Sequence, residues 1–419
     1  MTLPRTADHQ MIASIAWDPA KPAERINDHL LMSRSTTNAY VITDPAGDVV
    51  INTALAVQGK RTRERFEELL GRPLKVAKIV YTQSHPDHTG GWEFFADPGV
   101  ETIGQRAFPQ ICAERKMLGA FFGPRNQRVL AALVPPGSPD HNWFATRDPE
   151  NMTLFADTHK FSVGSRDYEL ISTPAGETLD SLAVWMPKEK TLFVGNLMGA
   201  LYGAPPHFST IRGDRQRSVP RFLNDIARLI ALEPEMMVTG HDEPTIGKDR
   251  VAADLGKLHA AVSYIHDETV KGMNAQKDVK TLMREIALPD HLVLAPGRGP
   301  VSWYVRAVWE EYAGWFQHAS TTELYGVPPS SVWPEVAALA GGATALAEKA
   351  KARVAAGENV EALHLTEIAL AAEPSNRPAL EASLAAYEAL AIANAGVHFD
   401  ELGWLEGRII ATKAALNGE

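Results

Sequence analysis

Two histidines and an aspartate occur within four residues of the sequence, a density of metal-binding side chains that needs an explanation. His85, Asp87 and His88 lie in the run YTQSHPDHTGGWEFF, directly after the apolar, β-branched segment 76–81. Imidazole nitrogens and a carboxylate are the ligands that Zn²⁺ or a related first-row metal prefers. A regular strand would alternate these side chains between its two faces, whereas a tight turn after a strand lets them converge. The alternative, histidines that only satisfy backbone groups of a surface loop, does not explain the clustering.

This loop resembles the H-x-H-x-D-H metal-binding loop of the metallo-β-lactamase superfamily, with Gln83 in place of the first histidine. Three later positions extend the resemblance. Glu177, in the stretch STPAGET, stands where most members of the superfamily have a histidine. A glutamate at this position is typical of the alkylsulfatase branch. Asn196 takes the place of the carboxylate that bridges two metals in that branch, and His241 ends the strand-like segment EMMVTGH.

Two further segments are similar to the alkylsulfatase branch, whose members cleave linear alkyl sulfates. The segment 209–213, STIRG, looks like its T-L-R-G motif, and 307–316, AVWEEYAGWF, looks like its A-V-Y-x-x-Y-L-G-W-F motif. The helical C-terminal part looks like the dimerisation domain of those enzymes. They usually continue into a lipid-carrier-like domain, before which this chain stops.

The resemblance implies two metal sites of unequal strength. It assigns one ion to Asp87, His88 and His241, and the other to Gln83, His85 and Glu177, with Asn196 between them. A neutral amide is a poorer zinc ligand than an imidazole, and Asn196 removes a negative charge. We therefore expect one firmly held ion, zinc in the first instance, and a second that binds more weakly. Mn²⁺ and Fe²⁺ stay open.

The expected chemistry is hydrolysis of an ester by metal-activated water. Asp87 could also steer the proton of that water, Asn196 lies at the bridging position, and Arg212 and Arg217 are candidate clamps for an anionic group. Their alternative reading is as ordinary surface arginines. Trp303 stands where the alkylsulfatases have a histidine that helps with the sulfate, and it would form an apolar pocket wall. With Gln83, this leaves sulfate ester hydrolysis in competition with hydrolysis of a carboxylic ester or lactone.

Elements that could position these residues alternate between strands and helices up to about residue 247. Segments 39–42, 48–51 and 76–81 read as strands, and later apolar runs repeat the pattern up to His241. Interleaved strands and helices predict an α/β layered core, which the resemblance sharpens to an αββα sandwich. Residues 106–151 are rich in Pro, Gly, Asn and Asp and predict an insertion with little regular structure.

The chain reads as helical from residue 250 onward. An alanine-rich part near the C-terminus resembles a helix-turn-helix repeat of the tetratricopeptide (TPR) type, with turns at 357–359 and 374–376. Fewer than two repeats are visible, too few for a free-standing solenoid. We therefore predict a catalytic domain over 1–250 and an all-α, TPR-like dimerisation domain over 251–419, which implies a homodimer.

Composition narrows the function further. The 419 residues are 45% hydrophobic and 22% charged, with a formal net charge of −10. An acidic chain is a poor partner for nucleic acid, and no apolar run has the ~20 residues of a membrane span. The single cysteine, Cys112, allows no internal disulfide, and the N-terminus lacks a signal peptide pattern, so we expect a cytoplasmic protein. The competing hypothesis is a non-catalytic relative that binds a ligand or partner with a degraded first metal site.

Overall fold

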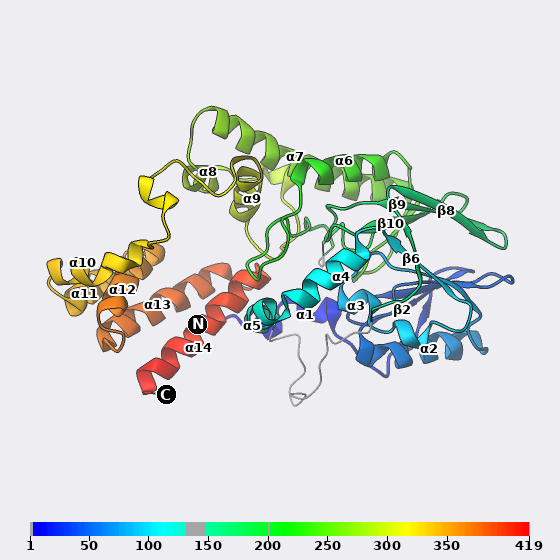
Figure 1. The fold of residues 1–419 in the computed structure, drawn as a ribbon, viewed down its shortest axis with the longest axis horizontal. Helices are drawn as coiled ribbons and strands as arrows, with labels where there is room; N and C mark the ends of the chain where they lie inside the picture. Colours follow the sequence, from blue (N-terminus) through cyan, green and yellow to red (C-terminus); the bar gives the residue numbers. More distant parts are fainter. Residues whose placement is uncertain (1–2, 131–147, 200–201, 419) are drawn as a thin grey trace. The chain divides into compact units, whose positions relative to one another are not determined.

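The computed structural model describes residues 3–130, 148–199 and 202–418, and the chain divides into two compact units (Figure 1). The larger unit holds most residues between Gln10 and Tyr312. The smaller unit contains Ala313–Glu419 and the N-terminal segment. This division falls near residue 312, whereas the sequence placed the domain boundary near residue 250. Each unit is described by itself below.

The first sheet of the larger unit has seven strands in sequence order. The pairs from β1 to β4 are antiparallel, and the pairs from β4 to β7 are parallel. Its strands are β1 (Glu24–Arg25), β2 (Leu30–Ser33), β3 (Ala39–Ile42), β4 (Asp48–Ile51), β5 (Val76–Val80), β6 (Glu101–Gln105) and β7 (Met152–Phe155).

The second sheet has six strands in the order β13-β12-β11-β10-β9-β8. All its pairs are antiparallel except β11 with β12. Its strands are β8 (Thr158–Val163), β9 (Arg166–Ser172), β10 (Leu182–Met186), β11 (Thr191–Phe193), β12 (Met236–Val238) and β13 (Thr245–Ile246).

The two sheets pack face to face, and each is covered by helices on its outer face. Strand β3 shows why its sequence is apolar throughout. Tyr40 and Ile42 point into the core between the sheets, while Ala39 and Val41 point into the core beneath the helices of the first sheet. A strand buried on both faces cannot alternate polar with apolar residues. The predicted αββα sandwich is confirmed.

The outer helices close each face of the sandwich. Helix α2 (Ala56–Leu70) packs Phe66 on the first sheet. The second sheet is covered by α6 (Val219–Ile230), α7 (Lys248–Asn274), α8 (Val279–Glu285) and α9 (Val301–Ala313), which lie on the opposite side of the strands from α2 (Figure 1). Helices α7 to α9, placed in the second domain by the sequence, therefore contribute to the core of the larger unit.

The insertion after the metal loop is more regular than the sequence predicted. Residues Phe108–Met117 form α4 and Gly119–Leu130 form α5, so the expectation of little regular structure is wrong for this part. Phe108 and Cys112 of α4 are buried against the first sheet. This burial stabilises α4 by packing, whereas the Gly and Pro residues that argue against a helix lie in α5. The rest of the predicted insertion, up to residue 147, lies outside the described residues.

The smaller unit is helical, as predicted. Its turns at 356–358 and 373–376 fall where the sequence placed them. Successive helices pack in sequence order through small buried residues such as Ala347, Ala369 and Ala382. The helices are α10 (Trp333–Leu339), α11 (Ala343–Ala355), α12 (Asn359–Ala372), α13 (Arg377–Asn394) and α14 (Phe399–Asn417). Within the described ranges, no helix has the length and apolar composition needed to cross a membrane.

The glycines that follow the metal loop allow a close backbone approach. A Cβ added at Gly91 would lie 2.2 Å from the carbonyl oxygen of Thr53 and 2.7 Å from the Cα of Gly59 on α2. A Cβ added at Gly90 would lie 2.4 Å from the backbone nitrogen of Ala56. Only glycine fits at these distances, so the backbone after the metal loop packs directly against the start of α2.

We predict that Gly91→Ala destabilises the protein by about 1–3 kcal/mol, because the added methyl group must displace backbone. Gly256→Ala on α7 is the matched control, since a Cβ there meets nothing within 4 Å. It should be neutral or stabilise the helix by up to about 1 kcal/mol. Thermal or urea unfolding of both variants measures the difference, and equal stabilities would contradict the close packing.

Candidate metal centre

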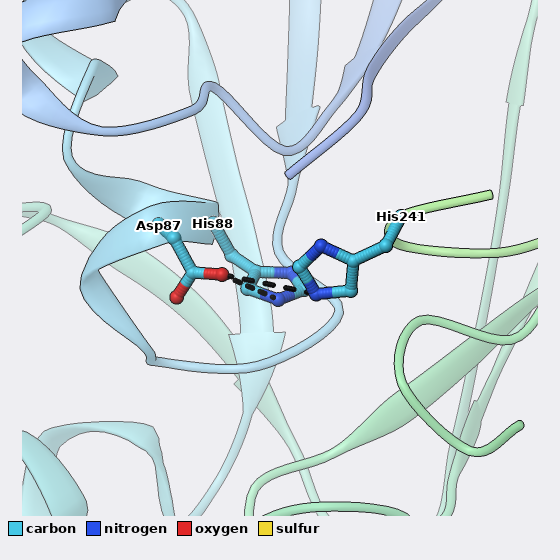
Figure 2. A group of neighbouring side chains, drawn as sticks. All are labelled: Asp87, His88 and His241. Carbon is cyan, nitrogen blue, oxygen red and sulfur yellow. Dashed lines mark ion pairs between the residues drawn. The ribbon is translucent and has the colours of Figure 1, made fainter. Parts of the chain in front are cut away.

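Three of the predicted ligands converge where strands of the two sheets end. Asp87 and His88 lie on the short helix α3 (Pro86–Thr89), which follows β5, and His241 follows β12 (Figure 2). Their possible ligand atoms all lie within 4.8 Å of one another. Asp87 Oδ2 lies 3.6 Å from His88 Nε2 and 3.9 Å from His241 Nε2. The sequence prediction for this ligand set agrees with the geometry.

The protonation of His88 is set by two buried neighbours. Asn52 Oδ1 accepts hydrogen bonds from Thr82 N and Thr82 Oγ1, each at 3.1 Å. Because the backbone N–H can only donate, the Asn52 atom must be the oxygen, and the Thr82 hydroxyl proton points towards it. Thr82 Oγ1 is then the acceptor for His88 Nδ1 at 3.1 Å. The His88 ring therefore carries its proton on Nδ1 and presents the lone pair of Nε2 to the centre.

His241 and Asp87 are oriented in the same way. His241 Nδ1 donates to the carbonyl oxygen of Thr36 at 2.7 Å, which leaves Nε2 facing Asp87. The Thr37 hydroxyl donates to Asp87 Oδ2. Hydrogen bonds of this kind fix the tautomer and the direction of metal ligands.

The surroundings favour the ligand forms of these groups. Burial lowers the pKa of His88 to about 4, although the Asp87 carboxylate opposes the shift, so the ring is neutral at neutral pH. Burial alone would raise the pKa of Asp87, but the neighbouring histidine rings and the Thr37 hydroxyl outweigh it and hold that pKa below its ordinary value. A neutral imidazole and an ionised carboxylate are the states that bind a divalent metal.

A buried amide oxygen supplies an independent test of fit. Asn196 Oδ1 is buried and makes no hydrogen bond to the described residues. A Cβ added at Gly240 would lie 2.2 Å from this oxygen and 3.3 Å from His88 Cε1, so Gly240 leaves the room that Asn196 needs beside His88. A buried oxygen without a donor is costly unless something else satisfies it. Asn196, Asp87 and the two Nε2 atoms together fit a divalent cation.

Gln83 and His85 belong to the same cluster in a different way. Gln83 Nε2 lies 2.9 Å from His85 Nδ1 and 3.1 Å from His88 Nε2. The amide therefore links the two histidines of the loop. Burial lowers the pKa of His85 well below its ordinary value, which keeps this ring neutral as well. Gln83 and His85 thus lie beside the Asp87, His88 and His241 cluster, and their role as ligands of a second metal stays a prediction.

Glu177 lines a small cavity of about 10 Å³ together with two basic residues, His207 and Arg298. Burial and three nearby arginines, Arg298 first among them, lower the pKa of His207 well below its ordinary value. Trp303 is not among the residues that line this cavity; it lies against Gly299 instead. Arg298 could not be recognised from the sequence, because the two glycines beside it form no known motif.

The two predicted arginine clamps differ in their surroundings. Arg217 is buried, with its guanidinium bonded to the carbonyl oxygen of His207 and paired with Asp214 Oδ2 at 2.9 Å. These contacts favour a structural role for Arg217. Beyond burial, the charges of Arg212 and Arg217 both lower the pKa of His85 and of His207, so both lie near the centre, but Arg217 is the one whose guanidinium is bound to a carbonyl and to Asp214. Arg212 and Arg298 are the better candidates for anion binding.

A buried carboxyl that the sequence analysis missed ties the Glu177 loop to the metal loop. Asp180 is fully buried, and its Oδ1 accepts from the Ser84 hydroxyl at 3.1 Å. Burial raises the pKa of Asp180. On the other side of the same residue, Arg115 of α4 donates to the carbonyl oxygen of Ser84 at 2.7 Å. Gln83 and His85 are therefore held through the residue between them.

Comparison with known proteins agrees with this architecture. Residues 279–400 match the family model described as alkyl sulfatase dimerisation. A linear primary-alkylsulfatase of a Pseudomonas species is 26% identical over 330 residues, which cover 72% of this chain and 60% of the relative. The alkyl/aryl-sulfatase BDS1 of Saccharomyces cerevisiae is 24% identical over 398 residues, which cover 87% of this chain and 60% of the relative.

Among solved structures, the stereoselective inverting sec-alkylsulfatase Pisa1 from Pseudomonas sp. superimposes with a TM-score of 0.77 at 19% identity. The match covers 95% of this chain and 66% of that one. The chain spans about 60% of the length of the curated relatives it matches. The chain is therefore similar to alkylsulfatases in sequence and in fold, and its sandwich has the metallo-β-lactamase architecture.

Proposed function

We propose that this protein is a metal-dependent hydrolase of sulfuric esters of apolar alcohols, with one firmly held zinc ion. The observation that carries the proposal is the convergence of Asp87 Oδ2 with the Nε2 atoms of His88 and His241. Two imidazoles and a carboxylate form a catalytic zinc set with room for water and substrate. The curated relatives cited above are named as sulfatases, which supports a sulfuric ester over a carboxylic ester or lactone.

The residues of the chain have separable tasks in this reaction. A divalent ion at the site would lower the pKa of bound water and polarise the ester. Asp87 accepts from Thr37, and its ionised carboxylate is placed to receive a proton from the attacking water. Arg212 and Arg298 contribute positive charge beside His207 and can hold the sulfate group. The carbonyl of Thr36 and the hydroxyl of Thr82 keep the two histidines fixed.

The weaker half of the site is proposed to bind a second ion poorly. Its protein ligands are Gln83, His85 and Glu177, and Asn196 replaces the bridging carboxylate. Glu177 is the only anionic side chain in that set, whereas tight binding of a second dication needs more negative charge. We further propose a homodimer through the helical unit, supported by the match to the dimerisation family. The cytoplasmic location stays a prediction.

The direct test of this function is sulfate release. Purified protein loaded with zinc should release inorganic sulfate from dodecyl sulfate, measured by ion chromatography, at a rate that chelation with EDTA abolishes and zinc restores. A chromogenic carboxylic ester of similar size serves as the comparison substrate. Faster turnover of that ester, or no turnover of either substrate, would contradict the proposal.

The number of zinc ions that the protein retains should reflect the unequal strength of the two proposed metal sites. We expect dialysed wild-type protein to retain about one equivalent of zinc by elemental analysis, because Glu177 is the single anionic ligand of the weaker half. His241→Ala should retain almost none and lose at least about 100-fold in sulfatase rate, since it removes a ligand outright. His364→Ala on α12, where the side chain is 73% exposed, is the matched control and should behave as wild type. Two tightly retained equivalents would contradict this assignment.

Orientation of His88 can be tested without touching a ligand. Thr82→Val removes the hydroxyl that accepts from His88 Nδ1, so zinc affinity should fall by about 10- to 100-fold. Thr82→Ser keeps the hydroxyl and should retain most of the affinity. Competition with a chromophoric chelator measures both values in the absence of substrate. Equal zinc affinities of the valine and serine variants would show that the Thr82 hydroxyl does not orient His88.

A further inference from the structure

Helices α4 and α5 connect the metal loop with the loop that carries Arg212. At one end, Arg115 donates to the carbonyl oxygen of Ser84, in the metal loop, at 2.7 Å. At the other, Arg125 donates to the carbonyl oxygens of Arg212 at 2.6 Å and Ile211 at 3.2 Å. The helix pair is therefore fixed to both parts of the proposed active site.

Two more contacts attach these helices to the same loop. Glu114 of α4 pairs with Arg215 through oxygen–nitrogen distances of 2.5 and 2.6 Å. Phe122 of α5 packs so closely on Gly213 that an added Cβ would lie 3.1 Å from its ring. The position of α4 and α5 beside the Arg212 loop thus rests on several independent contacts.

The joint between α4 and α5 exposes large apolar side chains. Met117 is 74% exposed, Leu118 is 39% exposed and Phe121 is 57% exposed. The Phe121 ring lies against Phe122, with ring centroids 5.3 Å apart, and the Arg125 guanidinium lies 5.0 Å from its centroid. Phe121 is therefore held in place although much of its surface faces solvent. Exposed apolar groups that gather beside a site mark a binding surface.

We propose that Met117, Leu118 and Phe121 form the surface that receives the apolar tail of the substrate. This inference rests on the proposed function and names the substrate class, an anionic ester of a linear aliphatic alcohol. Arg125, whose guanidinium lies over the Phe121 ring, also holds the backbone of the loop that carries Arg212. An ester whose anionic head lies at the metal centre and Arg212 would extend its chain along α4 and α5. Charge at one end and apolar surface at the other match such an amphiphile.

The test measures how affinity depends on chain length. Alkanesulfonates from hexyl to dodecyl, which cannot be hydrolysed, are titrated calorimetrically into the zinc-loaded full chain below their micellar concentrations. Each methylene buried on the protein should strengthen wild-type binding by up to about fourfold. In Phe121→Ser the affinity should depend less on chain length. In the double variant Met117→Ser/Phe121→Ser it should hardly depend on chain length at all. Ile410→Ser, which replaces an isoleucine 64% exposed on α14, is the matched control and should keep the wild-type slope.

The same series of alkyl sulfates, followed by sulfate release, separates this inference from the proposed function. Wild-type turnover with an unchanged chain-length slope in both serine variants would overturn the tail surface and leave the sulfatase proposal standing. A lost binding slope in the variants, without sulfate release by wild type, would support the surface and overturn the sulfatase. Circular dichroism of each variant confirms that a flattened slope does not come from unfolding.

Discussion

The parallel pairing of β4 with β5 is the constraint on which the metal centre depends. Ile51 pairs with Val80, so the residues just beyond the two strand ends lie side by side. Asn52 adopts a left-handed backbone conformation with φ of 59°, which asparagine tolerates better than most residues. There its Oδ1 meets both donors of Thr82, and the hydroxyl of Thr82 in turn fixes His88. The tautomer of a ligand is thus determined by strand register.

A second constraint joins the two sheets at the same point. Tyr40 of β3 donates to the carbonyl oxygen of Thr239 at 2.7 Å, and burial raises the pKa of its phenol. In the same region the backbone N–H of Asn38 donates to the carbonyl oxygen of Gly240 at 2.6 Å. These bonds hold the end of β12 against the first sheet and so place His241 opposite His88. The centre is therefore stabilised by contacts that cross the sandwich, and its ligands come from both halves.

The sequence predicted what local pattern can encode. The strands β3, β4 and β5 are short apolar runs that local pattern predicts. The residue types and spacing of His85, Asp87 and His88 predict a metal-binding loop. Thr37, Asn52 and Asp180 could not be found in that way, because a single threonine, asparagine or aspartate near a strand end is ordinary turn chemistry. Their roles arise only when distant segments meet.

Helices α4 and α5 illustrate the opposite error, in which local pattern misleads. Gly119, Gly123 and Pro124 argue against a helix, and Pro124 does lie inside α5. Burial of Phe108 and the ties of Arg115 and Arg125 to the site loops outweigh those weak local preferences. Tertiary contacts regularly override propensities of about 1 kcal/mol per residue.

Charge balance links the neutral residues of the candidate site to the proposed reaction. Gln83 and Asn196 add no negative charge to the site, while Arg212 and Arg298 bring positive charge close to His207. The two carboxyl side chains of the proposed ligand sets, Asp87 and Glu177, cannot offset the charge of two divalent ions. A site with this surplus of positive charge is a weak host for a second cation and a good host for an anion. This charge balance supports the proposal of one firmly bound metal ion and an anionic substrate.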